Sequence, residues 1–187
     1  ASLTMQAVGK EVEVCPWLRE FDTGYKTRPD FHPTGHGWDF LPEHWAREPM
    51  YYDPENWMKA PAYKNSGIDA VYRSVVQQFD LLIAKHGYER QDHLYAALRP
   101  NTENILLFCH FGIECVLFNC SPVVLWHHTV ALPSSVTIVS TEERAPGKAI
   151  FRMSRFGDLS HLDAAGEVPS FSARFCERHG DGTREDY

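Results

Sequence analysis

An unbroken apolar run at residues 105–109 (ILLFC) constrains the fold of this chain more than any other feature. A strand that is apolar at every position is typical of a parallel sheet whose two faces are both covered by helices. Gly112 follows the run, and residues 113–119 are predicted to form a helix. A strand followed directly by a helix indicates α/β layering.

The remaining sequence patterns predict one long helix, one short strand and a hairpin. In residues 67–87 the apolar side chains recur every three or four positions, which predicts an amphipathic helix. Residues 11–15 alternate between polar and apolar and predict a short strand. Residues 136–140 and 149–154 predict an antiparallel hairpin at the sheet edge. We therefore expect a three-layer α/β sandwich with a mostly parallel sheet and an antiparallel edge.

The 187 residues are enough for one domain with a substantial core. We assign this domain to residues 1–162 and a polar tail to residues 163–187. Residues 25–63 combine closely spaced prolines with many aromatic side chains, so we expect a structured insertion without long elements. This insertion is either a ligand-binding surface or a cap over the domain's own core.

Charge and cysteine usage restrict the partners and the compartment. There are 18 Lys and Arg residues against 25 Asp and Glu residues, a net charge of −7, which argues against a nucleic-acid partner. The longest apolar stretch, residues 105–118, is too short and too polar to cross a membrane. The five cysteines form no CxxC pair, which favours a reducing compartment, the cytoplasm.

His110 is the first candidate for chemistry, because it follows the predicted buried strand. Ligands of open α/β sheets bind beyond the carboxyl ends of the strands. Phe111 and Gly112 lead directly into the predicted helix, whose start offers free backbone N–H groups to an anion such as phosphate, and a charged histidine adds a further donor. The alternative is a structural histidine that bonds a neighbouring loop.

Glu20 is the second candidate, because it follows the strand predicted at residues 11–15 and so lies at the same sheet edge. A phosphate nearby would raise the pKa of this carboxyl and allow it to act as a general acid. The alternative is a solvated loop carboxylate.

Two motifs together resemble the histidine phosphatase superfamily, also called phosphoglycerate mutase-like. The sequence Cys-His-Phe-Gly at residues 109–112, between a strand and a helix, is similar to the family's second-histidine motif, usually Ser-His-Gly-Gly. Leu18-x-Glu20-x-x-x-Gly24 resembles its Leu-x-Glu-x-x-x-Gly segment. The 67–87 helix and the approach to a late strand at 133–136 fall in the family's order. The resemblance covers roughly residues 1–160.

The resemblance implies hydrolysis of a small-molecule phosphomonoester through a phosphohistidine, without a metal or another cofactor. By position, His110 would stabilise the transferred phosphoryl group and Glu20 would protonate the leaving oxygen. Phe111, Gly112, Ser135 and Trp38 are the expected substrate contacts.

This chain departs from the family in two ways. Phe111 replaces the usual glycine. No Arg-His-Gly strand precedes Glu20, so the domain is expected to lack its N-terminal part, and the nucleophile is not evident. The tripeptide Arg178-His179-Gly180 lies in a charged tail and is interpreted as a coincidence, although in a permuted chain it would supply the nucleophile.

Two other functions stay open. A metal-dependent hydrolase would use the histidines at positions 32, 36 and 44, although no established zinc spacing is matched. A non-catalytic protein would bind a partner through the aromatic residues of 25–63. A homodimer is also an open alternative.

Overall fold

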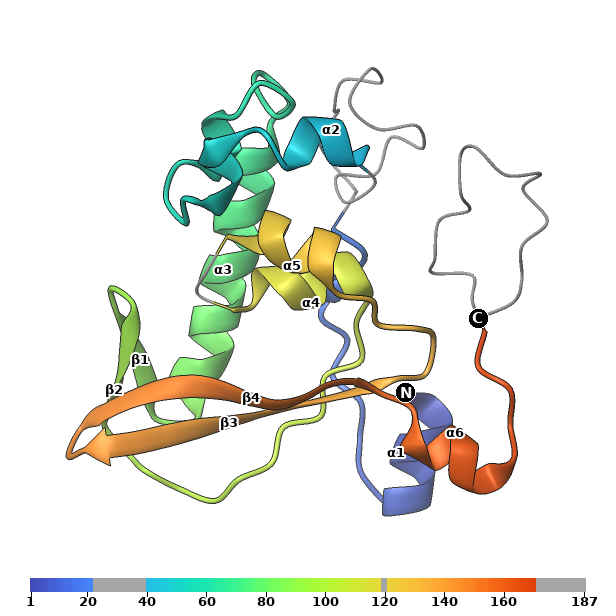
Figure 1. Cartoon of the computed structure of the whole chain (residues 1–187). Helices are drawn as coiled ribbons and strands as arrows, with labels where there is room; N and C mark the ends of the chain where they lie inside the picture. Colours follow the sequence, from blue (N-terminus) through green and yellow to red (C-terminus); the bar gives the residue numbers. More distant parts are fainter. Residues whose placement is uncertain (22–39, 119–120, 171–187) are drawn as a thin grey trace.

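The computed structural model describes residues 1–21, 40–118 and 121–170 (Figure 1). Along the chain, short helices precede one long helix, a small hairpin, two further helices, a long hairpin and a last short helix. The elements are α1 (Ser2–Val8), α2 (Pro42–Trp45), α3 (Ile68–Lys85), β1 (Tyr88–Gln91), β2 (Leu94–Ala97), α4 (Phe111–Val116), α5 (Pro122–His128), β3 (Val136–Ala145), β4 (Lys148–Asp158) and α6 (Ser160–Ala165), with 3-10 turns at Pro16–Leu18, Pro49–Tyr52 and Trp57–Lys59.

The helix predicted over residues 67–87 is confirmed as α3, which is 18 residues long. Its apolar stripe (Ile68, Val75, Phe79 and Ile83) is buried. The chain then turns at Gly87, whose φ is +91°. A Cβ at this position would lie 2.7 Å from Cβ of Arg99, so only glycine allows the chain to pass so closely into β1.

The described sheet has four strands in the order β1-β2-β4-β3, and all three pairings are antiparallel. The hairpin predicted over residues 136–154 is confirmed as β3 and β4, in which Ser140 pairs with Arg152. Two residue pairs connect it to the first hairpin, Tyr95 with Ala149 and Ala96 with Lys148.

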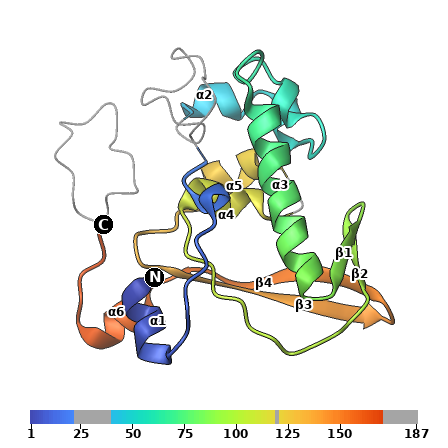
Figure 2. The same ribbon diagram turned by 180° about the vertical axis from the view of Figure 1, so that it is seen from behind.

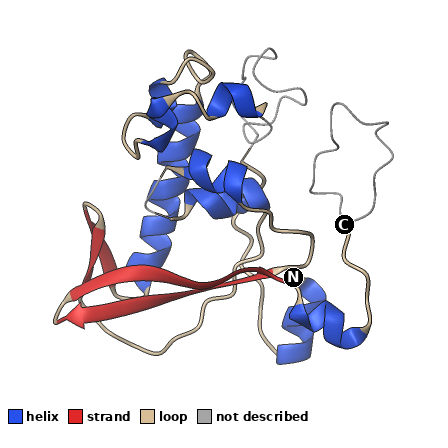
Figure 3. Cartoon of the chain, viewed as in Figure 1, coloured by secondary structure: helices blue, strands red, loops and turns tan. Residues whose placement is uncertain are grey.

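The mostly parallel sheet was wrong, and so was the phosphoglycerate mutase-like sandwich that contained it. Residues 105–109 are extended but belong to no strand, and the strand predicted at 11–15 is also absent (Figure 3). An apolar run indicates that its side chains tend to be buried. A strand also needs a neighbouring strand with which its backbone N–H and C=O groups can pair. Leu107 packs against the core, but Leu106 and Phe108 remain 63% and 46% exposed.

An aromatic core lies between α3, α4, α5 and the turns of residues 40–63. Figures 1 and 2 show the arrangement of these helices and turns from two sides. Trp57 is fully buried, with its ring edge-to-face against Tyr63 at 5.4 Å and against Trp126 at 5.7 Å. Tyr51 and Tyr63 are buried beside it. In its described part the aromatic segment therefore caps the core with its largest side chains.

Within the described residues, every helix is too short or too polar to pass through a lipid bilayer.

Helix α3 provides a matched test of this packing. Ile83 is buried against the first hairpin, whereas Leu81, an isomer of the same size on the same helix, is 54% exposed. We expect Ile83→Ala to lower the free energy of unfolding by about 2–5 kcal/mol and Leu81→Ala to change it by less than about 0.5 kcal/mol. Urea denaturation followed by circular dichroism measures both, and equal losses would contradict the packing.

Candidate functional site

A groove of about 1140 Å³ lies between residues 101–111 and the strand β3. The ends of α3 and α4 complete its lining. Segment 101–111 and β3 run in opposite directions along it. At one end Tyr88, just after α3, accepts a hydrogen bond from Thr141 of β3 at 3.4 Å. At the other end Glu114 of α4 is hydrogen-bonded to Thr137.

The structure brings together four of the six residues predicted to form the site. Glu20, His110, Phe111 and Ser135 all line the groove, although they come from three distant parts of the chain. Trp38 lies outside the described residues.

Gly112 does not line the groove, because it is buried under α5. The indole Nε1 of Trp126 donates a hydrogen bond of 3.0 Å to its carbonyl oxygen. The carbonyl of Gly112 thus forms a structural contact between α4 and α5.

His110 is held at the mouth of the groove by helix α4. It is the N-cap residue, with extended backbone angles (φ −127°, ψ 165°), and its carbonyl accepts from the backbone N–H of Glu114 at 3.0 Å. Ile113, Cys115 and Val116 of α4 are buried and fix the helix in the core. The imidazole itself is exposed and free to meet a ligand.

Glu20 is positioned by its neighbour Phe21. The Phe21 side chain is 1% exposed and packs against Trp126 at 5.5 Å. Its backbone N–H donates to Oε1 of Glu20 at 2.7 Å. The carboxylate therefore points from an anchored residue into the groove.

Glu114 is a site residue that the sequence analysis missed. It lies half-buried in the groove, and its carboxyl is hydrogen-bonded to the Thr137 hydroxyl, which accepts from Gly157 N at 3.1 Å. Burial raises the pKa of this carboxyl, and the bond from Thr137 partly opposes the shift. Its spacing of four from His110 places both residues on one side of the helix start, a signal that the sequence contained.

The thiol of Cys109 is influenced by both carboxylates. Burial raises the pKa of its thiol to about 12, and the negative charges of Glu114 and then Glu20 add to the shift. A thiol that stays protonated is a poor nucleophile. Cys109 therefore contributes packing rather than nucleophilic chemistry.

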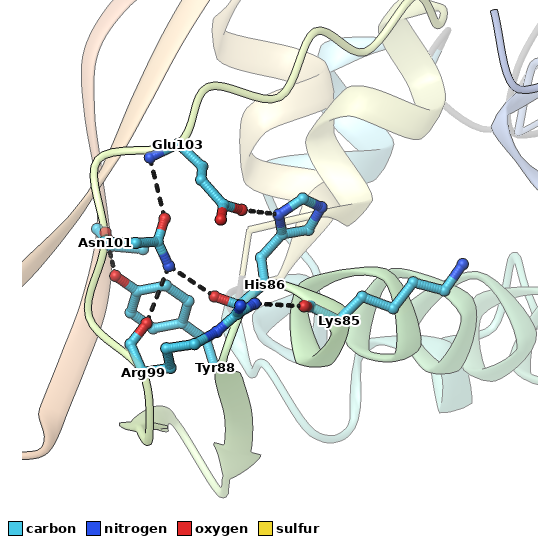
Figure 4. Close-up of polar contacts among 7 residues, drawn as sticks. Lys85, His86, Tyr88, Arg99, Asn101 and Glu103 are labelled. Atoms are coloured by element: carbon cyan, nitrogen blue, oxygen red, sulfur yellow. Dashed lines mark hydrogen bonds and ion pairs between the residues drawn. The ribbon is translucent and has the colours of Figure 1, made fainter.

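The groove is acidic. Three glutamates (20, 103 and 114) and two histidines (86 and 110) line it, and no Lys or Arg among the described residues does. Figure 4 shows the far end, where His86 Nδ1 lies 2.6 Å from Oε2 of Glu103. This hydrogen bond lowers the pKa of Glu103.

The same cluster fixes the start of the extended segment. The Asn101 side chain donates to the carbonyl oxygens of His86, at 2.8 Å, and of Arg99, at 2.9 Å, while its own carbonyl accepts from Glu103 N at 3.0 Å. Segment 101–111 is thus attached to the end of α3 at one end and to α4 at the other.

In the part of the chain that the structure describes, no three His, Cys, Asp or Glu side chains are grouped to hold a metal ion. Of the histidines considered as ligands, His44 lies in α2. His32 and His36 lie outside the described residues, as does Arg178-His179-Gly180.

Comparison of the chain with protein-family models, with curated proteins and with solved structures found no match.

The raised pKa of Glu114 predicts a specific pH dependence of stability. The folded protein holds this proton more tightly than the unfolded chain, so ionisation of Glu114 lowers the free energy of unfolding as pH rises from about 4.5 through the raised pKa. Glu114→Gln removes this loss. The variant should therefore gain stability relative to wild type across that pH range, with a constant difference above it.

Urea denaturation at a series of pH values measures this difference. Glu11→Gln, at an exposed carboxylate outside the groove, is the control and should show no such trend. A Glu114→Gln difference that is flat with pH would refute the assignment.

Proposed function

We propose that the groove hydrolyses small-molecule phosphomonoesters, with His110 stabilising the transferred phosphoryl group and Glu114 protonating the leaving oxygen. The observation that carries the proposal is the meeting of Glu20, His110, Glu114 and Ser135 in one groove. The parallel sheet implied by the resemblance is not found among the described residues, so the proposal rests on these side chains and not on the fold.

Each proposed role follows from position and protonation. Phosphoryl transfer depends mainly on positioning and on stabilising charge at the phosphoryl oxygens, and the exposed imidazole of His110 can donate a hydrogen bond to them. When the P–O bond breaks, the leaving oxygen needs a proton. Burial keeps the Glu114 carboxyl protonated to a higher pH than usual, so it can supply that proton.

Glu20 is the weaker proton donor of the two carboxyl groups. Its Oε1 accepts a hydrogen bond from the Phe21 backbone N–H, which favours the ionised form of this carboxyl, whereas burial favours the protonated form of Glu114. We therefore move the proton-donor role that the resemblance implied for Glu20 to Glu114. Glu20 remains a candidate for orienting the substrate or a water molecule.

The phosphoryl group is transferred finally to water, whose oxygen forms the new P–O bond of inorganic phosphate after the ester P–O bond breaks. The phosphohistidine that the resemblance implies as an intermediate is assigned to none of the described residues. His86 lines the groove but is engaged by Glu103 at its far end. The proposal includes no metal or other cofactor. It also places the protein in the cytoplasm, where the thiols of Cys15 and Cys109 would stay reduced.

Two aryl phosphates whose leaving groups differ can distinguish proton donation by Glu114 from charge stabilisation by His110. Loss of a proton donor matters most for a poor leaving group, so Glu114→Gln should slow turnover of phenyl phosphate by about 100-fold or more and that of 4-nitrophenyl phosphate much less. His110→Ala removes charge stabilisation and should slow both by about 100-fold.

Phosphate and phenol release measure these rates for the full chain. His161→Ala, on α6 and away from the groove, is the matched control and should turn over at the wild-type rate. Absence of any phosphatase activity that depends on His110 would disprove the proposed function. A leaving-group effect in Glu20→Gln, and none in Glu114→Gln, would return the proton-donor role to Glu20.

A further inference from the structure

We infer that Thr137 is the positioning residue for Glu114, because its hydroxyl holds the carboxyl group with the acid proton on the oxygen that faces a substrate. The inference rests on the proposed phosphatase activity and names the residue that orients its proton donor. It is carried by an irregularity in the β3–β4 hairpin, by the direction of the Thr137 hydroxyl and by the half-buried position of Glu114 in the groove.

The pairing of β3 with β4 is irregular at Thr137. Val136 pairs with Asp158. The next pair joins Ile138 to Arg155, so between the two pairs β3 has one residue, Thr137, and β4 has two. An extra residue on one strand is a β-bulge, and bulges beside active sites commonly re-aim a side chain.

Gly157 is one of the two β4 residues in the bulge, and only glycine fits there. Its φ is +61°, and a Cβ would lie 2.9 Å from the carbonyl oxygen of Val130. The backbone N–H of Gly157 donates a hydrogen bond of 3.1 Å to Oγ1 of Thr137. The bulge therefore directs a backbone donor at the Thr137 hydroxyl.

This hydrogen bond sets the direction of the hydroxyl proton. Because Oγ1 of Thr137 accepts from Gly157, its single proton remains to be donated, and the Glu114 carboxyl is its side-chain partner. A protonated carboxyl carries its proton on one oxygen and accepts through the other. Thr137 thus occupies the accepting oxygen and leaves the acid proton on the oxygen that can meet a substrate in the groove.

Burial and the Thr137 hydroxyl act on the Glu114 proton in opposite directions. Burial raises the pKa of the carboxyl, and the hydrogen bond from Thr137 lowers it. A general acid works best when its pKa is near the working pH, so that it holds its proton and can still release it. Thr137 therefore orients the proton and also limits how tightly it is held.

The orientation matters at the moment of bond cleavage. As the ester P–O bond breaks, its electron pair stays on the leaving oxygen, which takes the Glu114 proton. Water supplies the oxygen of the new P–O bond, and one of its protons returns to Glu114. A carboxyl that can rotate delivers its proton less often to the leaving oxygen, because transfer requires hydrogen-bond distance.

Carboxyl ¹³C NMR of the full chain, labelled at glutamate Cδ, tests the contact without a substrate. Thr137→Val keeps the shape of the side chain but removes the hydroxyl, so it should raise the pKa of Glu114 further. Thr137→Ser retains a hydroxyl and should restore the wild-type pKa. Thr141→Val is the matched control, because Thr141 lies on the same strand and lines the same groove but bonds Tyr88.

Turnover of phenyl phosphate tests the positioning role. We expect Thr137→Val to lower kcat roughly tenfold, and Thr137→Ser to recover most of that loss. The decline of kcat/KM at high pH, where Glu114 loses its proton, should move to higher pH in Thr137→Val by the same amount as the pKa measured by NMR. A purely structural role for Thr137 would not move this decline.

Two results would overturn the inference. These are a wild-type pKa of Glu114 in Thr137→Val, and a raised pKa accompanied by wild-type turnover of phenyl phosphate. Failure of the proposed function looks different, because no variant and no wild-type protein would then show turnover that depends on His110. A raised Glu114 pKa in that case would keep the contact with Thr137 and would overturn its role in proton donation.

Discussion

The position of Trp126 determines how the candidate site is assembled. Its ring packs edge-to-face on Trp57 and beside Phe21, and its indole N–H bonds the carbonyl of Gly112. Trp126 thereby connects the turns of residues 40–63, the start of α4 and the segment that contains Glu20 and Phe21. Because His110 caps α4 and Glu20 adjoins Phe21, this core fixes the positions of both candidate side chains.

The groove and the missing parallel sheet have the same physical origin. Residues 105–109 carry the composition of a buried strand, but no strand of the described sheet pairs with them. Their unpaired backbone and the free edge of β3 leave a space lined by apolar side chains and by carboxylates at one end. Burial of Glu114 at that end of the groove raises the pKa of its carboxyl.

Periodicity predicted the elements that local pattern determines, namely helix α3 and the β3–β4 hairpin. It failed where structure depends on a partner, because an apolar run such as 105–109 does not specify what covers it. Glu20 lines the groove although residues 11–15 before it form no strand, because the buried side chain of Phe21 holds this part of the chain in place. Glu114 was missed because it stands inside an apolar stretch, where a carboxylate gives no periodic signal, and only its spacing from His110 reveals it.

The central claim is that Glu20, the start of α4 and Ser135 form one site for a transferring phosphoryl group. Titration of the ¹⁵N-labelled chain with orthovanadate, an analogue of that group, followed by ¹H–¹⁵N correlation NMR, tests it most directly. We predict saturable shifts confined to the amides around residues 20, 110–114 and 135–137, lost in His110→Ala. Shifts at other positions, or none up to millimolar vanadate, would contradict the account.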